Sequence, residues 1–205
     1  MGDVVEVING QGQLAKVSVE KISKDAATCH ILELTVAKKP PYTITLALAL
    51  IKQTSLELAI EKATEIGVDE FFLFSADRSQ KKECSEHAVD RLQTIMTSAT
   101  KQCGRLFLPT LSIKKSLHDC MNKSHYHLFG ALESSMPYRE IIPHIAQHKE
   151  VTLWIGPESG FSDEELTFFT THSVQGISLS PFTLRAETAA IAGSLLLYHA
   201  FALHS

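Results

Sequence analysis

The chain has 205 residues, of which 44% are hydrophobic and 20% charged, and its 19 Lys and Arg against 23 Asp and Glu give a formal net charge of −4. This composition is that of a globular protein long enough to bury its own core, so it excludes disordered and fibrous classes. The negative balance also argues against a protein that coats nucleic acid indiscriminately, although it leaves room for a local basic patch.

The sequence contains neither a membrane segment nor an export signal. The apolar run at 43–51 covers nine residues, whereas a membrane helix needs about 20. The chain opens with MGDVVEVINGQGQ, which lacks the basic start and apolar core of a secretory signal. We therefore expect a cytoplasmic protein with no membrane partner.

Cysteine and histidine spacing favours no metal site. The four cysteines include no C-x-x-C pair, and none of the ten histidines belongs to an H-E-x-x-H motif. We expect reduced thiols and no bound metal.

Residues 1 to 38 are expected to form a small β unit. A short apolar run at 3–8 precedes an Asn-Gly-Gln-Gly turn, and apolar and polar residues then alternate over 14–19 and 27–36. Three strands are few for an independent domain, so the unit is either a docked appendage or part of a barrel. Lys38-Lys39-Pro40-Pro41 makes a stiff connection, which places a second domain over 42–205.

From Tyr42 onward, short apolar runs alternate with helical patterns, as is typical of an α/β protein with a parallel sheet buried on both faces. Caps are predicted at Thr54, with Glu57 three residues on, and at Ser162, with Glu165 three residues on. Extended segments are expected at 43–51, 71–74, 106–113, 126–132, 151–155 and 176–179. Helices are expected at 54–67, 85–103, 114–121, 138–147, 162–171 and 186–203.

The segment Trp154-Ile-Gly-Pro-Glu-Ser-Gly-Phe161 directly follows a predicted strand and precedes a capped helix. Ligands of open α/β sheets bind beyond such strand ends. Gly156 and Gly160 permit a close approach of the backbone, while Pro157 stiffens the turn. Glu158 between them is either part of a ligand site or a carboxylate that complements the dipole of the next helix.

A second segment, Leu179 to Ala189, also leads from a strand end through a loop into a helix. Arg185 and Glu187 stand where that helix begins, beside N–H groups that lack intrahelical partners. Glutamate is favoured there, whereas the helix dipole opposes a cation. The arginine is therefore expected to face something anionic.

These segments carry a resemblance to a known family. IGPESGF and LSPFTLRAETAA look like the signatures I-G-P-E-G-G and L-G-x-R-I-L-R-x-E-T-A of the RsmE family, the ribosomal RNA uridine N3-methyltransferases of the SPOUT superfamily. KQCGR at 101–105 resembles the family's E-Q-C-G-R, and EKATEIGV at 61–68 its K-x-x-E-L-G-V. The four matches occur in family order.

The resemblance implies a SPOUT domain with a trefoil knot that binds S-adenosylmethionine, dimerises through the knot region and methylates N3 of a uridine in 16S ribosomal RNA of the small subunit. It also makes residues 1–38 similar to the later strands of a PUA-like RNA-binding barrel. Two alternatives stay open. One is a SPOUT-fold RNA-binding or ribosome-assembly protein without activity, and the other is a SPOUT methyltransferase acting on transfer RNA.

The resemblance also implies roles for individual residues. Arg185 is the expected catalytic cation, with Glu187 orienting it or, less favoured, accepting the proton. The RNA-binding candidates are Lys38, Lys39, Lys101 and Arg105. Three loops at 128–132, 155–160 and 179–184, together with the last helix, are expected to hold the cofactor through Leu128, Gly130, Ile155, Gly156, Pro157, Glu158, Gly160, Leu179, Ser180, Leu184, Ala186 and Thr188.

Three positions depart from the family pattern. Ser159 and Ser180 stand where the signatures have glycine, and Phe182 stands where they have arginine. Because serine adopts left-handed backbone conformations less readily than glycine, the cofactor loops are expected to be slightly reshaped. The missing arginine removes a contact with RNA or phosphate.

Overall fold

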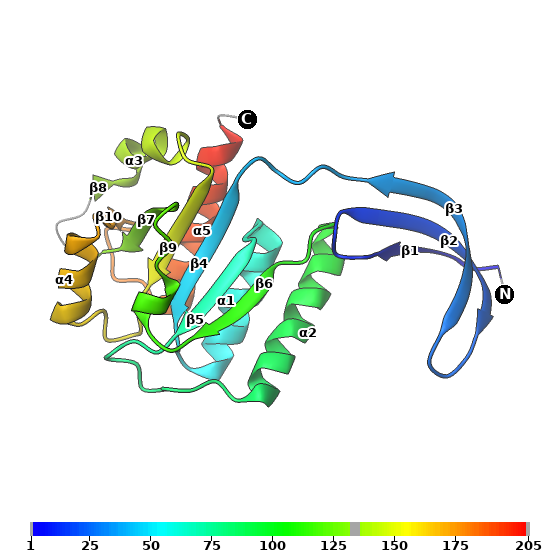
Figure 1. The fold of residues 1–205 in the computed structure, drawn as a ribbon, viewed down its shortest axis with the longest axis horizontal. Coiled ribbons are helices and arrows are strands. Elements are labelled where there is room, and N and C mark those ends of the chain that lie inside the picture. Colours follow the sequence, from blue (N-terminus) through cyan, green and yellow to red (C-terminus); the bar gives the residue numbers. More distant parts are fainter. Residues whose placement is uncertain (1, 132–135, 204–205) are drawn as a thin grey trace.

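A computed structural model of the chain describes residues 2–131 and 136–203. The chain forms a three-stranded antiparallel sheet and a seven-stranded sheet whose strands all pair in parallel, with helices on both faces of the larger sheet (Figure 1). This arrangement confirms the predicted α/β class. Within the described ranges, no helix combines the length and apolar character needed to cross a bilayer.

The smaller sheet contains the three strands expected near the N-terminus, β1 (Val4–Ile8), β2 (Gln13–Ile22) and β3 (Ala27–Val36). It extends away from the larger sheet as an open ribbon (Figure 1). The turn between β1 and β2 docks on the segment before β6, where the N–H of Gly12 donates to Leu106 O at 2.8 Å and that of Leu108 to Gly10 O at 2.9 Å. That residues 1–38 form a separate RNA-binding domain stays a prediction.

The strands of the larger sheet lie in the order β6-β5-β4-β9-β7-β10-β8. Since they are parallel, all their carboxyl ends meet at one edge. The strands are β4 (Thr43–Ala49), β5 (Glu70–Phe74), β6 (Thr110–Lys114), β7 (Tyr126–Gly130), β8 (Met136–Pro137), β9 (Glu150–Ile155) and β10 (Gln175–Ser178). The predicted strand over 126–132 ends at Gly130, and residue 132 lies outside the described ranges.

Two apolar clusters cover the two faces of this sheet. Alternate residues of β4 divide between them, with Leu46 and Leu48 in one cluster and Ala47 and Ala49 in the other. The first face packs against α1 (Gln53–Ile66), α2 (Glu86–Cys103), α3 (Tyr138–Ile145) and α5 (Ala186–Ala202), and the second against α4 (Asp163–Thr171) and the 3-10 helix η1 (Leu117–Cys120).

Glycine allows α5 to lie close to the sheet. A Cβ atom on Gly193 would come within 2.4 Å of Leu153 Cδ2 on β9. Any larger residue there would force the Leu153 side chain or the helix to move. The glycine therefore lets the helix pack closely on the strand that leads to the Gly156 loop.

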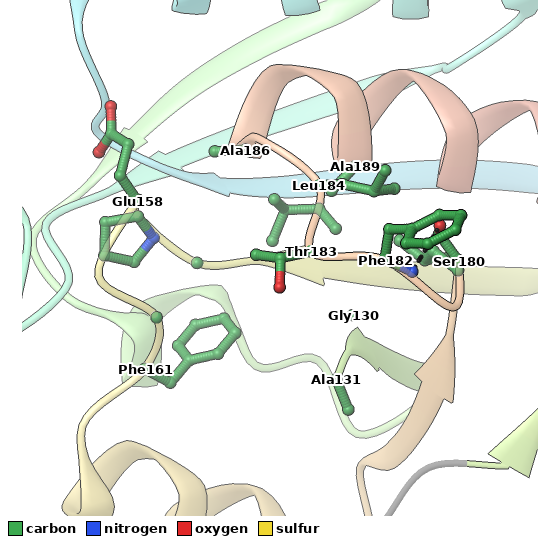
Figure 2. Close-up of a pocket in the computed structure, with 15 residues that line it drawn as sticks. Gly130, Ala131, Glu158, Phe161, Ser180, Phe182, Thr183, Leu184, Ala186 and Ala189 are labelled. Atoms are coloured by element: carbon green, nitrogen blue, oxygen red, sulfur yellow. Dashed lines mark hydrogen bonds between the residues drawn. The ribbon is translucent and has the colours of Figure 1, made fainter. Parts of the chain in front are cut away.

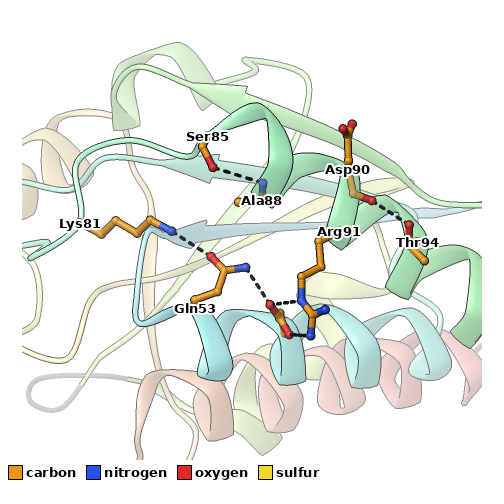
Figure 3. Close-up of polar contacts among 8 residues, drawn as sticks. Gln53, Lys81, Ser85, Ala88, Asp90, Arg91 and Thr94 are labelled. Atoms are coloured by element: carbon orange, nitrogen blue, oxygen red, sulfur yellow. Dashed lines mark hydrogen bonds and ion pairs between the residues drawn. The ribbon is translucent and has the colours of Figure 1, made fainter.

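The capping box predicted at Thr54 and Glu57 is wrong. Helix α1 begins one residue earlier, with Lys52 as its N-cap and no side-chain cap. The Glu57 carboxylate instead binds Arg91 of α2, with Nε–Oε1 and Nη2–Oε2 distances of 2.6 and 2.7 Å, and also accepts from Gln53 Nε2 at 2.9 Å. Figure 3 shows Gln53 and Arg91 together with the hydrogen bonds that they make. A carboxylate held by an arginine 34 residues away is not available to cap its own helix.

Two segments between β5 and β7 differ from prediction. The extended segment expected at 106–113 becomes a strand only after Pro109. It lies at the edge of the sheet, as the proline indicates, so only its start differs from the prediction. The helix expected at 114–121 is the four-residue 3-10 helix η1.

The helix expected around Pro143 forms, and the proline lies inside α3.

Candidate functional site

A cavity opens at the carboxyl ends of β7, β9 and β10, the place where ligands of parallel α/β sheets bind (Figure 2). Three segments far apart in the sequence form its wall, namely the end of β7, the loop after β9, and the loop after β10 with the first turn of α5. The lining residues are Gly130, Ala131, Ile155, Gly156, Pro157, Glu158, Gly160, Phe161, Leu179, Ser180, Phe182, Thr183, Leu184, Ala186 and Ala189.

Two glycines keep the floor of this cavity open. A Cβ atom on Gly130 would lie 3.1 Å from Ile155 Cδ1, and one on Gly156 would lie 3.2 Å from the Phe161 ring. Larger residues would crowd both walls. The cavity is therefore a cradle of backbone and apolar side chains, which suits a flat, largely apolar group such as an adenine ring.

Hydrogen bonds fix the loop after β9 to the loop after β5. The Ser162 hydroxyl caps α4 by accepting from the N–H of Glu165 at 3.1 Å, and it also donates to Asp77 Oδ2 at 2.5 Å. The carboxylate of Glu165 accepts from the N–H groups of Ser162 and Asp77 at 2.8 and 3.0 Å. Ser159 Oγ donates to Arg78 O at 2.9 Å. The predicted capping box at Ser162 is confirmed, and its carboxylate also joins two loops.

The loop after β10 is held by its own serines. Ser178 Oγ donates to Ser180 O at 3.3 Å, and Ser180 Oγ accepts from the N–H of Phe182 at 3.0 Å. Within the described ranges, the N–H groups of Thr183 and Leu184 make no hydrogen bond to protein. They are therefore available to an acceptor in the cavity, and Figure 2 shows the Thr183 side chain pointing into that space.

The serines that replace family glycines do not strain these loops. In the described part of the chain, Ser173 is the one non-glycine residue with a positive φ, so Ser159 and Ser180 both have ordinary backbone conformations. Gly160 does adopt a left-handed φ of 73°. The serines therefore bring no backbone strain, and Gly160 keeps the conformational freedom that its φ requires. The expectation that the cofactor loops are slightly reshaped stays a prediction.

Most of the predicted cofactor-binding residues line the cavity, but Leu128 and Thr188 do not. Leu128 is fully buried in the core beneath the sheet. Thr188 is exposed on α5, where Ala186 and Ala189, three residues apart, share the face toward the cavity. Figure 2 shows the Glu158 carboxylate pointing away from Thr183 and Phe161. The lining residues absent from the predicted set are Ala131, Phe161, Phe182, Thr183 and Ala189.

Arg185 is the N-cap residue of α5, and its exposed guanidinium forms no ion pair with any described residue. Glu187 is half-buried in the first turn of the same helix. The predicted pairing of these two side chains is not made within the described ranges. Arg185 therefore carries an unneutralised charge next to the cavity wall formed by Leu184 and Ala186.

The four predicted RNA-binding residues lie at the edge where the strands begin, opposite the cavity. Lys38 and Lys39 are exposed before β4, and Lys101 is exposed in the last turn of α2. Arg105 follows α2 and differs, because its guanidinium donates to Thr64 O and Val68 O at 2.9 and 2.7 Å and forms an ion pair with Asp69. This geometry favours a structural role for Arg105 over contact with RNA.

Beside Arg105, Asp69 Oδ2 accepts from the N–H of Ile44 at 3.0 Å. Burial of the carboxyl raises the pKa of Asp69, an effect that this hydrogen bond and the arginine oppose. No group of three or more His, Cys, Asp or Glu side chains in the described ranges is arranged to hold a metal ion.

Comparisons with known proteins agree with this geometry. A family model described as an RNA methyltransferase domain matches residues 38–197. The ribosomal RNA small subunit methyltransferase E of Rickettsia conorii is 29% identical over 197 residues, which cover 93% of this chain and 78% of the relative. The protein of the same name from Mesomycoplasma hyopneumoniae is 33% identical over 156 residues, 75% of this chain and 68% of the relative.

A solved structure is also similar over nearly the whole chain. A methyltransferase from Legionella pneumophila, solved in complex with S-adenosylmethionine, matches with a TM-score of 0.88 and 30% identity, covering 97% of this chain and 84% of the other.

Proposed function

The chain belongs to the RNA methyltransferase domain family and, within it, to the ribosomal RNA small subunit methyltransferase E group, and we propose that it methylates N3 of a uridine in 16S ribosomal RNA. The observation that carries this proposal is the cavity at the strand ends, lined by the two segments that resemble the family signatures. S-adenosylmethionine is the methyl donor, and a 30% identical relative binds the same molecule.

The cavity wall supplies what this cofactor needs. Ile155, Leu179 and Leu184 provide apolar surface for the adenine. The N–H groups of Thr183 and Leu184, which have no hydrogen-bond partner among the described residues, offer hydrogen bonds to its polar edge. The cofactor's sulfonium supplies an activated methyl group to the acceptor nitrogen. The loops bind and orient, so most of the rate comes from positioning and not from covalent help.

Methylation at N3 requires the uracil to lose its N3 proton, which leaves negative charge on the ring. Arg185 is the cation proposed to meet that charge, or the adjoining phosphate, because it is exposed beside the cavity and forms no ion pair among the described residues. Glu187 is proposed as the proton acceptor or as the residue that orients Arg185 once RNA is bound.

RNA binding relies on local cations, because a net charge of −4 provides no general attraction. Lys38, Lys39 and Lys101 are proposed to hold RNA at the edge of the sheet where the strands begin. At the cavity edge, the loop after β5 presents further cations, including the exposed Lys82. A rigid RNA surface that spans the molecule, such as a ribosomal particle, fits this wide spacing.

A homodimer and the trefoil knot are part of the same proposal. Helix α5 and its C-cap residue present apolar side chains that the single chain leaves outside its core, including Leu195 and Leu203, which are 54% and 58% exposed. Large exposed apolar side chains at this helix support an interface between two copies of the chain. Light scattering at micromolar concentration should give twice the chain mass of 22.6 kDa, and a monomer at every concentration would contradict the dimer.

The proposed activity is tested by offering the purified protein isotope-labelled S-adenosylmethionine with small-subunit particles from a strain that lacks this gene, and with transfer RNA. Mass spectrometry of the nucleosides should find 3-methyluridine in the ribosomal RNA alone. Methylation of transfer RNA alone would instead support the alternative enzyme. Tight binding of the particle without any methyl transfer would support a non-catalytic assembly protein.

A further inference from the structure

The exposed ring of Phe182 is exceptional among the phenylalanines of this chain. The chain has ten phenylalanines, and the other nine are buried or half-buried. Phe182 is 77% exposed and lines the cavity, and Figure 2 shows it at the opposite end from Phe161, with Thr183 between them. A single exposed apolar residue elsewhere on a protein surface is common and needs no explanation. An exposed flat ring at the mouth of a binding cavity is less common and calls for a functional explanation.

The loop holds this ring in place before any ligand arrives. The N–H of Phe182 donates to Ser180 Oγ at 3.0 Å, and the carbonyl of Ser180 accepts from Ser178 Oγ at 3.3 Å. Pro181 between them has a restricted φ. The backbone that carries the ring is therefore ordered in advance, and little conformational entropy is lost when a ligand binds against it.

The charge near the ring narrows the class of ligand. Arg185 follows three residues later with an exposed guanidinium and no ion pair among the described residues, whereas Glu158 lines the other end of the cavity. A flat apolar face next to an unpaired cation suits a molecule that combines a planar ring with negative charge. A nucleotide of single-stranded or looped RNA has both features.

We propose that Phe182 is a stacking platform for a base of the RNA substrate at the mouth of the cofactor cavity, with Arg185 meeting the phosphate or the charged edge of the same nucleotide. This inference rests on the proposed function. In the signature that this segment resembles, the position of Phe182 is an arginine. A stacked ring carries no charge, so this contact should add nothing to the salt dependence of RNA binding.

Single-turnover methylation of small-subunit particles, measured against enzyme concentration, tests this role with Phe182→Ala, Phe182→Leu and Phe182→Tyr. Alanine and leucine both lack a flat ring and should weaken apparent RNA affinity by about fivefold to a hundredfold, the range expected for one lost base stack. Tyrosine should retain affinity. The affinity for S-adenosylmethionine, measured by calorimetric titration, should not change in any of the three variants.

Leu58→Ala, which removes an apolar side chain that is 43% exposed on the distant helix α1, is the matched control. It should behave as the wild type.

The salt dependence of RNA binding gives a second, independent test. Phe182→Ala should leave the slope of log affinity against log salt unchanged, whereas Phe182→Arg should steepen it by about 0.7 to 0.9.

Several results would overturn the stacking role while the proposed function stands. These are full activity of Phe182→Leu, a loss explained wholly by weaker cofactor binding, and a fall in molecular mass that would place the ring in a subunit contact. Absence of methylation by the wild-type protein would instead contradict the proposed function itself.

Discussion

Replacing Glu165 with alanine should loosen the cavity wall, because this carboxylate joins α4 to the loop after β5. Its side chain is 6% exposed, and its two oxygens accept from the N–H groups of Ser162 and Asp77 at 2.8 and 3.0 Å. The substitution leaves both donors without their acceptor. Because Ser162 is buried, leaving its N–H without an acceptor lowers the free energy of unfolding by about 1 to 3 kcal/mol. Asp77 is exposed, so its N–H can bind water instead, and the cost there is about 0.5 to 1 kcal/mol.

Together these losses lower the free energy of unfolding by about 1.5 to 4 kcal/mol, which corresponds to a melting temperature lower by about 3 to 16 °C for a chain of this size. Glu165→Gln keeps one carbonyl acceptor and should fall between alanine and the wild type. Affinity for S-adenosylmethionine should fall as well, because the same loop carries Gly160 and Phe161 into the cavity.

The matched control is Glu164→Ala, one residue earlier in the same turn. Glu164 is exposed and is close to the helix N-terminus, so its loss costs only about 0.3 to 1 kcal/mol of dipole interaction. Urea unfolding and calorimetric titration of the cofactor give the two readouts. If both alanine variants lose the same stability and bind the cofactor equally, the reasoning that Glu165 joins the two loops is wrong.

Three further predictions concern the reaction, the RNA surface and pH. Arg185→Ala should slow single-turnover methylation about a hundredfold, the loss of roughly 3 kcal/mol typical of one preorganised charge, while calorimetry shows unchanged cofactor affinity; a parallel loss of both would make it structural. Reversing the charge of Lys38 and Lys39 together should weaken binding to small-subunit particles in a filter assay without changing cofactor affinity, and an equal loss of both would indicate misfolding. Burial lowers the pKa of His127, whose Nδ1 accepts from Trp154, below its ordinary 6.5, so the unfolded chain takes up a proton that the folded state resists. The free energy of unfolding is therefore highest above about pH 6.5 and falls as the pH is lowered, by up to about 1.4 kcal/mol per pH unit. His127→Gln should flatten the dependence of melting temperature on pH, and an unchanged slope would refute this assignment.

Local patterns predicted the elements where local forces decide them. Ser162 caps its helix as expected, because its hydroxyl reaches the N–H of the residue three positions later. At Thr54 the same rule failed, since Glu57 binds Arg91 of another helix. No sequence spacing encodes that contact, which exists only once α1 and α2 pack against each other.

The same contrast holds for the residues of the site, some of which the local sequence predicts and some of which it does not. Gly156 and Gly160 could be predicted, because the loop directly follows an apolar strand and its glycines suit close approach. Leu128 does not line the cavity, because it lies two residues before the strand ends, where its side chain enters the core. Thr188 does not line it either, because the helical period places Ala186 and Ala189 on the cavity face instead.

The contact between Asp77 and Glu165 spans 88 residues, and neither residue belongs to a signature-like segment. It depends on β5 and β9 ending at the same edge of the sheet, with β4 between them. Strand order follows from the whole fold and not from any one window of sequence. Long-range polar contacts of this kind therefore remain outside the reach of pattern reasoning.

The three departures from the family pattern have different physical weight. Ser159 and Ser180 occupy backbone conformations open to any residue, and each adds a hydrogen bond that steadies its loop. Neither serine strains the backbone, so neither gives a reason to expect weaker cofactor binding. Phe182 has the larger effect on chemistry, because it places an exposed ring at the cavity mouth where the family signature has a cation, and we propose that this ring faces the RNA. Any difference between this chain and its relatives should therefore appear in RNA recognition and its salt dependence.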